Sequence, residues 1–209
     1  MAGRELSLPN NVVWSIFEDY SGDVWIGTDH GVTISDKSSG HRFVGIENIT
    51  GKKDGQDISV IEMDNEGQIW LGGHDGLIYC SSNLNSVMWF KSDSKRPDER
   101  LSHNKVRDLY DDGEVMWIVS DGGLDAYVHK TGKIIKCKIT EPTGKFSSNW
   151  MYSIAEDSDG RLWIGTYDGG LFAIQKERLL NGNGEVIADM HLSVESTPSL
   201  RSNIVRLVA

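Results

Sequence analysis

Hydrophobic and polar residues alternate along short stretches of this chain, and the same succession of stretches recurs four times. Each recurrence begins with an alternating run, as at residues 12–17 and 151–155. An acidic turn containing glycine follows, and then a short apolar run rich in Val, Ile and Trp. Alternation with a period of two predicts half-buried β-strands, and the turn residues between the runs predict hairpins. The pattern therefore indicates antiparallel β-structure built from repeats.

Tryptophan marks the same place in each repeat, at intervals of 45, 47 and 46 residues. The four residues are Trp25, Trp70, Trp117 and Trp163. A fixed period of roughly 20–50 residues is the signature of a repeat architecture. A large aromatic side chain at a fixed place in every repeat is suited to fill the space between packed sheets. We therefore interpret these four residues as structural wedges.

The turn before the tryptophan reads Asp-x-x-Gly at residues 19–22, 64–67 and 157–160. The third repeat is one residue shorter, because Asp112 is followed directly by Gly113. Aspartate in such a turn accepts hydrogen bonds from nearby backbone, and glycine adopts the positive φ that the turn requires. We expect the aspartate to cap each turn in this way.

A second glycine turn, a third strand and an outer strand complete each repeat, with outer strands expected at residues 42–44 and 133–138. Four strands in a unit of about 40–50 residues form the blade of a β-propeller. We predict an all-β fold with four four-stranded antiparallel blades and the first strand of a fifth, as a fragment of a larger propeller. The blades are expected at approximately residues 8–54, 55–100, 101–145 and 146–199, and residues 200–209 repeat the start of a blade.

The phrase Asn-x-Val-x-x-Ile-x-x-Asp-x-x-Gly-x-x-Trp-Ile-Gly-Thr-x-x-Gly is nearly complete at residues 11–31 and 149–169. It resembles the repeat of the two-component regulator propellers. The middle repeats depart from the phrase through Gln56, Gly73, Val119 and Ser120. In that family the propellers form the periplasmic sensor region of hybrid histidine kinases. Such kinases are typical of polysaccharide-degrading Bacteroidetes and sense glycan breakdown products.

The resemblance implies that this chain is an extracytoplasmic ligand-sensing piece of a hybrid two-component sensor histidine kinase. Its ligand would be an oligosaccharide from polysaccharide breakdown. Its partners would be the remaining blades and the signalling domains of the parent chain. Two alternatives stay open: a propeller scaffold for protein interactions, and a propeller lyase or glycosidase.

The composition of the 209-residue chain is that of a globular protein, with 38% hydrophobic and 25% charged residues. Its formal net charge of -10 argues against nucleic acid, because no basic stripe is available to neutralise phosphates. It contains no run of 18 apolar residues, so we expect no membrane-spanning segment. Residues 1–5 lack the apolar core of a signal peptide, so a periplasmic location rests on the resemblance alone. Cys80 and Cys137 fall on different predicted strands and are expected to be free, buried thiols.

Candidate ligand residues lie in the loops that precede the innermost strands and follow the tryptophan strands, because both sets emerge on one face of a propeller. One amide recurs at the same offset in every repeat. These amides are Asn11, Gln56, Asn104, Asn149 and Asn203. They are either caps on loop backbone or a ring of groups offered to sugar hydroxyls.

Positions that differ from blade to blade point more directly to recognition. Trp14, Arg107 and Tyr152 occupy equivalent positions on three innermost strands, and Trp150 lies two residues before Tyr152. Aromatic planes and a planar guanidinium fork are the groups that grip sugars or carboxylates. The alternative is that these side chains pack against neighbouring blades.

Metal and catalytic motifs are absent from the sequence. His30 and His74 fall one position apart in corresponding loops and are able to approach each other, but no histidine spacing is typical of zinc. We expect no metal and no cofactor. Asp108 and Glu156 are the one carboxylate pair that propeller geometry could direct into the central channel. Without a nucleophile or metal motif, we expect no catalytic activity in this fragment.

An open arc of four blades exposes the face of its first blade and of its last. Exposed apolar faces of this kind seek partners. One prediction is a homodimer in which two arcs close an eight-bladed ring and exchange residues 203–208. The alternatives are an open arc and a distorted closed ring of four blades.

Overall fold

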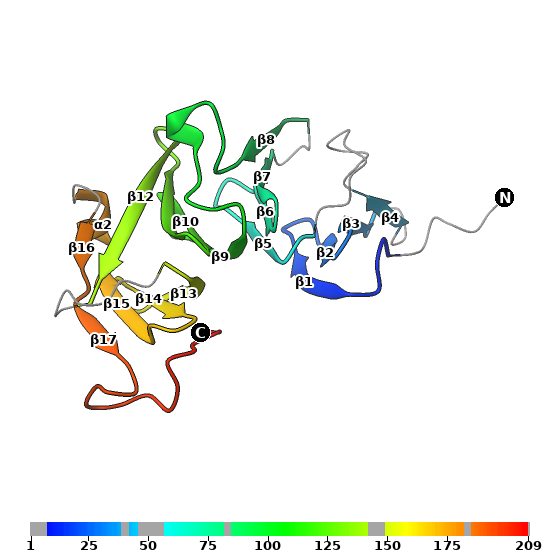
Figure 1. Cartoon of the computed structure of the whole chain (residues 1–209). Helices are drawn as coiled ribbons and strands as arrows, with labels where there is room; N and C mark the ends of the chain where they lie inside the picture. Colours follow the sequence, from blue (N-terminus) through cyan, green and yellow to red (C-terminus); the bar gives the residue numbers. More distant parts are fainter. Residues whose placement is uncertain are drawn as a thin grey trace.

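Four sheets follow one another in chain order in the computed structural model, which describes residues 8–38, 42–45, 57–81, 85–141, 149–181 and 185–208 (Figure 1). Each sheet is one blade of a β-propeller, and the predicted all-β fold is confirmed. The first blade contains β1 (Val13–Glu18), β2 (Val24–Thr28), β3 (Gly31–Asp36) and β4 (Arg42–Gly45). The second contains β5 (Val60–Met63), β6 (Ile69–Gly73), β7 (Gly76–Cys80) and β8 (Val87–Phe90).

The later two blades have the same antiparallel order, with one short 3-10 helix, η1 (Pro97–Glu99), before the third. The third blade contains β9 (Val106–Asp111), β10 (Val115–Ser120), β11 (Gly123–Val128) and β12 (Lys133–Thr140). The fourth contains β13 (Met151–Glu156), β14 (Arg161–Thr166), β15 (Leu171–Gln175) and β17 (Met190–Leu192).

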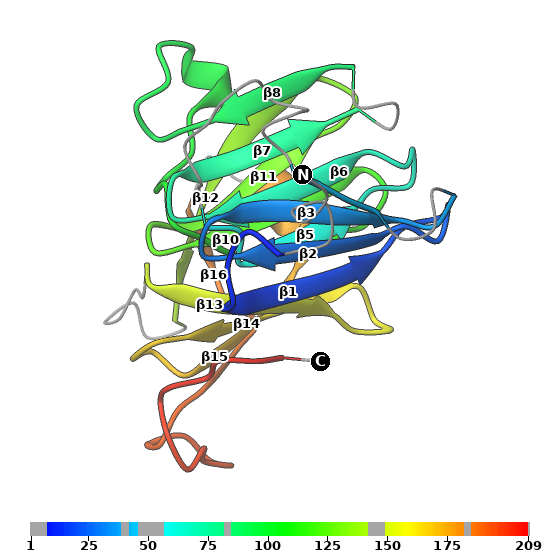
Figure 2. The ribbon, with the colours of Figure 1, turned by 90° about the vertical axis from the view of Figure 1, so that its right-hand side faces the viewer.

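The first strand of every blade is the innermost one, because β1, β5, β9 and β13 contact one another in that order. Figure 2 views the arc from its first blade, which lies nearest the reader. Each first strand pairs antiparallel with the tryptophan strand, so Val106 lies opposite Ser120 and Asp111 lies opposite Met116. The loops before the first strand and after the tryptophan strand therefore share one end of each blade, which we call the loop end. The Asp-x-x-Gly turns lie at the opposite end, which we call the turn end.

The hydrophobic core lies between blades, because each of its three clusters combines residues of two neighbouring blades. Trp70 and Trp117 are fully buried in this way, whereas Trp163 of the fourth blade is only half-buried. The first blade has one uncovered face. Its Ile16 is 70% exposed, while the equivalent Leu109 and Ile154 are 4% and 5% exposed. Burial of the apolar positions thus depends on the adjacent blade, as in other repeat proteins.

Glycine in the tryptophan strand allows the next blade to approach closely. A Cβ on Gly27 would lie 2.5 Å from the carbonyl oxygen of Ile58, and one on Gly165 would lie 2.6 Å from that of Val205. The backbone N–H of Ile58 donates to Thr28 over 2.9 Å, and that of Val205 donates to the equivalent Thr166 over 2.8 Å. Val205 therefore lies on the fourth blade as Ile58 lies on the first, although residues 204–208 form no assigned strand.

One excursion of the chain departs from the simple four-strand pattern. Between β15 and β17 the chain forms α2 (Lys176–Asn181) and then β16 (Glu185–Ile187), which pairs parallel with β12 of the third blade. The third sheet therefore has five strands. Leu179 and Val186 from this excursion are buried in the core between the third and fourth blades, so the excursion joins these blades. Its apolar residues show no alternation long enough to distinguish it from an ordinary hairpin in the sequence.

Cys80 and Cys137 are buried and free, as predicted. Burial raises the pKa of each thiol to about 12, which keeps both protonated and unreactive at neutral pH. Within the described ranges, no helix has the length and apolar character needed to cross a membrane.

Candidate functional site

The turn end carries the same hydrogen-bonded unit in all four blades. One carboxylate oxygen of the turn aspartate accepts backbone N–H groups, such as those of Gln68 at 2.9 Å for Asp64 and Arg161 at 3.0 Å for Asp157. The turn glycine has a positive φ in each blade, for example 76° at Gly67. The predicted capping of these turns by aspartate is therefore confirmed.

The second carboxylate oxygen has a role that the sequence analysis missed. It accepts the indole N–H of the repeated tryptophan in every blade. The pairs are Trp25–Asp19 at 2.8 Å, Trp70–Asp64 at 2.9 Å, Trp117–Asp112 at 2.9 Å and Trp163–Asp157 at 2.7 Å. The tryptophans are therefore wedges whose only polar group is satisfied by the turn. The similar spacing of Asp and Trp, six residues in three blades and five in the third, was the available signal, but spacing alone does not show that two side chains meet.

These contacts stabilise the ionised carboxylates. The indole of Trp163, followed by backbone and guanidinium N–H groups of Arg161, holds the pKa of Asp157 well below its usual range. Burial alone would raise the pKa of Asp112, but hydrogen bonds from Trp117 and from backbone N–H groups outweigh it and lower that pKa. The hydrogen bonds therefore favour the ionised form of Asp112 and Asp157.

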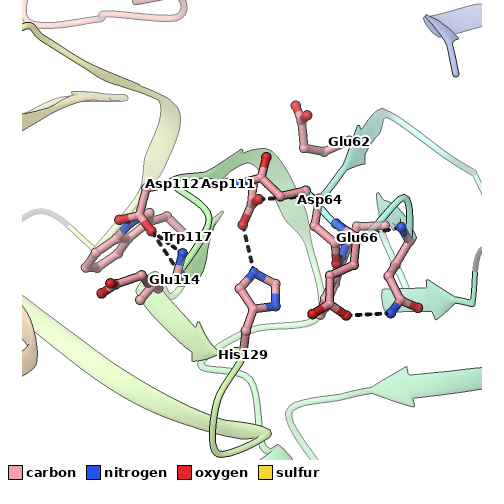
Figure 3. A network of polar contacts seen from close by, with 12 residues as sticks. Glu62, Asp64, Glu66, Asp111, Asp112, Glu114, Trp117 and His129 are labelled. Atoms are coloured by element: carbon pink, nitrogen blue, oxygen red, sulfur yellow. Dashed lines mark hydrogen bonds and ion pairs between the residues drawn. The ribbon is translucent and has the colours of Figure 1, made fainter. Parts of the chain in front are cut away.

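Charged groups also join neighbouring blades at the turn end, as Figure 3 shows for the second and third blades. Nε2 of His129 lies 2.7 Å from Oδ1 of Asp111, and Oδ2 of Asp111 accepts the backbone N–H of Asn65 at 3.3 Å. The hydrogen bond with Asp111 raises the pKa of His129. Burial, and then the nearby Asp111 and Asp108, raise the pKa of Glu62. The contact between the second and third blades, which we call the blade joint, thus contains two groups with raised pKa values, His129 and Glu62.

Asp108 and Glu156, the two carboxylates that the sequence left open as pointing into the channel, have separate partners in the structure. Asp108 accepts backbone N–H groups of Leu109 and Ile154, both at 3.0 Å, and burial raises its pKa to about 6. Glu156 instead binds Lys176 at 2.9 Å and accepts the Tyr110 hydroxyl at 3.0 Å. Both carboxylates therefore connect the third blade to the fourth.

The loop end brings together three of the predicted ligand residues, at the junction of the third and fourth blades. Arg107 on β9 donates two hydrogen bonds to Asp121, at 2.7 and 3.2 Å. Its guanidinium carbon lies 4.6 Å from the ring centre of Tyr152 on β13. Cations within about 6 Å of a ring centre are attracted to its π face. Arg107 and Tyr152 are equivalent residues of adjacent blades, each the second residue of its innermost strand, and they meet across the junction.

Aromatic side chains extend this group along the fourth blade. The ring centres of Trp150 and Tyr167 lie 4.5 Å apart, and those of Tyr152 and Tyr167 lie 5.9 Å apart. Trp150 is 42% exposed. We call Arg107, Asp121, Trp150, Tyr152 and Tyr167 the loop-end cluster. Asp121 and Tyr167 were not among the predicted site residues, although their equivalent offset after the tryptophan could have suggested them.

The other predicted residues lie in separate pairs within their own blades. Trp14 donates its indole N–H to Asp29 at 2.5 Å, in the first blade. Nδ1 of His30 lies 2.9 Å from Nδ2 of Asn10, which is also a residue of the first blade. Nδ1 of His74 lies 2.5 Å from Oδ2 of Asp57, in the second blade. The two histidines are thus held by different partners. In the described parts of the chain, no group of three or more His, Cys, Asp or Glu side chains has the arrangement of a metal site.

The recurring amides act on loop backbone where the structure shows their contacts. Oδ1 of Asn104 accepts the backbone N–H of Ser92 at 2.7 Å, and Oδ1 of Asn203 accepts that of Val194 at 2.9 Å. Asn149 is exposed at the start of the fourth blade. Gln56 lies outside the described residues. Capping is therefore the role of Asn104 and Asn203, which favours the first of the two readings for these amides.

Comparison with known proteins supports the repeat and the fold. The family model of the two component regulator propeller matches residues 7–30 and 145–168. No curated protein sequence matches the chain. One similar solved structure is the extracellular domain of BT4673 from B. thetaiotaomicron, assigned to the hybrid two component systems. It is 34% identical with a TM-score of 0.73, and the match covers 97% of this chain and 28% of that one.

Two other structures show how widely the fold is shared. The extracellular domain of BT3049, from the same organism and likewise assigned to the hybrid two component systems, is 22% identical with a TM-score of 0.68. That match covers 96% of this chain and 24% of that one. A streptogramin B lyase is 15% identical with a TM-score of 0.57, over 83% of this chain and 54% of its own. These two likenesses show the fold alone. The chain spans about a quarter of the length of the Bacteroides structures it matches.

Proposed function

Because this chain carries repeats of the two-component regulator propeller family, we propose that it is part of the extracytoplasmic sensor region of a hybrid two-component system. The similarity to an extracellular domain of such a system, at 34% identity over 97% of the chain, supports this role and location. The parent protein is then a histidine kinase, and the propeller binds a signal molecule without converting it. The further blades and signalling domains of that parent are its partners.

The proposed ligand is an oligosaccharide, and the loop-end cluster is its binding site. The observation that carries this proposal is the meeting of three aromatic rings with a paired Arg107 and Asp121 at one blade junction. Sugar rings present apolar C–H faces to aromatic planes and hydroxyls to charged donors and acceptors. At the turn end Arg161 also pairs with Asp157 and lies 5.9 Å from the ring centre of Trp163, but that contact involves one ring, whose indole is hydrogen-bonded within its blade.

Titration of the protein with a panel of oligosaccharides, followed by calorimetry, tests the proposal. Trp150→Ala should weaken binding by about 2 kcal/mol, or roughly thirtyfold, as expected for an exposed aromatic anchor. Tyr20→Ala is the matched control, because Tyr20 is an exposed aromatic residue in a turn-end loop. It should leave affinity unchanged. Equal affinities of wild type and Trp150→Ala would contradict the location of the site, and product formation from any glycan would contradict a purely sensing role.

A further inference from the structure

The geometry points to neutral sugar rings, rather than carboxylated ones, as the ligand class of the loop-end cluster. This inference rests on the proposed function and adds the chemical class of the ligand. Arg107 would ordinarily suggest an acidic ligand, because its planar fork matches a carboxylate. In this structure the fork already has a carboxylate partner.

Asp121 compensates the charge of Arg107. Nε and Nη2 of Arg107 donate to the two carboxylate oxygens of Asp121, at 2.7 and 3.2 Å. The two side chains are 22% and 14% exposed, so the pair is largely withdrawn from water. A ligand carboxylate would have to displace Asp121 or lie beside it. Two carboxylates beside each other repel, so the ligand carboxylate and Asp121 would disfavour binding together. Loss of the bidentate contact between Arg107 and Asp121 would weaken binding further.

Tyr152 holds the guanidinium plane in place. Its ring centre lies 4.6 Å from the guanidinium carbon of Arg107, within the range of a cation–π contact. The guanidinium therefore cannot turn toward an incoming anion without losing both the cation–π contact with Tyr152 and the hydrogen bonds to Asp121. Because the guanidinium of Arg107 is held in place and its charge is compensated, the site favours a ligand that does not require a free cation.

A sugar hydroxyl fits the groups that remain. Among the described residues, no hydrogen bond involves Nη1 of Arg107, while the oxygens of Asp121 each retain capacity for a second donor. A hydroxyl is both donor and acceptor, so one hydroxyl can donate to Asp121 and another can accept from Arg107. A carboxylate has only acceptor oxygens and can satisfy the arginine but not the aspartate.

The neighbouring aromatic rings complete the fit to an uncharged ring. Trp150, at 42% exposure, offers a face next to Tyr167, with ring centres 4.5 Å apart and planes tilted by 45°. Aromatic faces carry partial negative charge, which favours sugar C–H groups and disfavours anions. The formal net charge of -10 also disfavours anionic ligands, at longer range.

Calorimetric titration with matched pairs of oligosaccharides tests the inference. Each pair consists of a neutral oligosaccharide and the same oligosaccharide with one ring oxidised to the uronate. Wild-type protein should bind the neutral member at least roughly tenfold more tightly, which corresponds to one charge-assisted hydrogen bond. A preference of the wild type for the uronate would overturn the inference while leaving the proposed function intact.

Asp121→Asn supplies the second arm of the test. The variant frees the charge of Arg107, so it should weaken neutral binding and strengthen uronate binding, and the tenfold preference should vanish or reverse. Asp159→Asn is the control, because it makes the same change of net charge at the exposed turn end. It should leave the preference as it is. Equal effects of the two substitutions would overturn the inference, and failure of every sugar to bind would overturn the proposed function together with it.

Discussion

The turn end and the loop end of the blades are built from the same strands. The side chains at the turn end are nearly the same in every blade, whereas those at the loop end differ from blade to blade. At the turn end, four aspartates make the same contact with four tryptophans, at distances between 2.7 and 2.9 Å. At the loop end, the two equivalent positions hold different residues in each blade: Trp14 and Asp29, Ser59 and His74, Arg107 and Asp121, and Tyr152 and Tyr167. A feature that every blade needs for packing repeats in every blade. Features that differ between blades at one place in the fold are available for recognition.

The largest effect expected from this comparison is the loss of a turn-end tryptophan. Trp70 is fully buried between the second and third blades and donates its indole N–H to Asp64. Trp70→Ala should therefore lower the free energy of unfolding by about 3–5 kcal/mol, as for other buried aromatic truncations. Trp150→Ala, at the loop end, should change it by about 1 kcal/mol or less, as for exposed positions. Urea denaturation measures both, and similar losses for the two variants would contradict the division of roles.

The hydrogen bond of the indole accounts for part of that effect. Trp70→Phe keeps an aromatic ring but leaves a buried oxygen of Asp64 without its donor. It should cost about 1–3 kcal/mol, the usual penalty for an unsatisfied buried group. A loss well under 1 kcal/mol in the same denaturation experiment would show that the Asp–Trp contact contributes little to stability.

The blade joint at His129 should make stability depend on pH. The pKa of His129 is raised in the folded protein by Asp111, so folding favours the protonated form. This contribution is fully present below the unfolded pKa of about 6.5 and is lost as pH rises through the higher folded pKa. The stability of wild type relative to His129→Gln, measured by thermal unfolding, should therefore be greatest below pH about 6.5 and should decrease as pH rises through the folded pKa.

Asp108 gives the same sign in the same experiment, but in a lower pH window than His129. Burial raises its folded pKa to about 6, so its ionisation between the unfolded pKa and that value disfavours the folded state. Asp108→Asn should therefore remove a loss of stability that wild type shows as pH rises through this window. A wild-type curve whose shape is unchanged by both His129→Gln and Asp108→Asn would exclude these groups as titrating elements.

The contact of residues 203–208 with the fourth blade gives a smaller effect. A Cβ on Gly165 would lie 2.6 Å from the carbonyl oxygen of Val205, so Gly165→Val should separate this segment from β14. Hydrogen exchange at the Val205 amide, which donates to Thr166, should become at least roughly tenfold faster, since the opening free energy falls by more than about 1.4 kcal/mol. Unchanged exchange would show that the segment is held by other contacts.

The same segment bears on self-association. It lies where the innermost strand of a following blade would lie, so a second copy could continue the arc only by displacing or exchanging it. The homodimer therefore stays a prediction, and light scattering over a concentration series, with and without Gly165→Val, would test it.

The sequence predicted the blades well because each blade repeats the same local chemistry. Alternation located the strands, and turn aspartates and glycines located the hairpins. It did not predict α2 and β16, because a chain excursion onto the previous blade depends on tertiary packing of residues such as Leu179. It also did not predict the contact between Arg107 and Tyr152, which lie 45 residues apart and meet only when two blades pack. The sequence identified candidate site residues because they differ between blades at equivalent positions. The side chains that they contact could be identified only in the structure.

Hydrogen-exchange mass spectrometry with and without a neutral oligosaccharide tests the central claim most directly. The loop end at the junction of the third and fourth blades should gain protection, in peptides that contain residues 103–107, 121–122, 150–152 and 167–169. The turn-end peptides around residues 64–67 and 157–160 should exchange at the same rate in both samples. Protection at the turn end, or none at the loop end under saturating ligand, would contradict the separation of a stabilising end from a binding end.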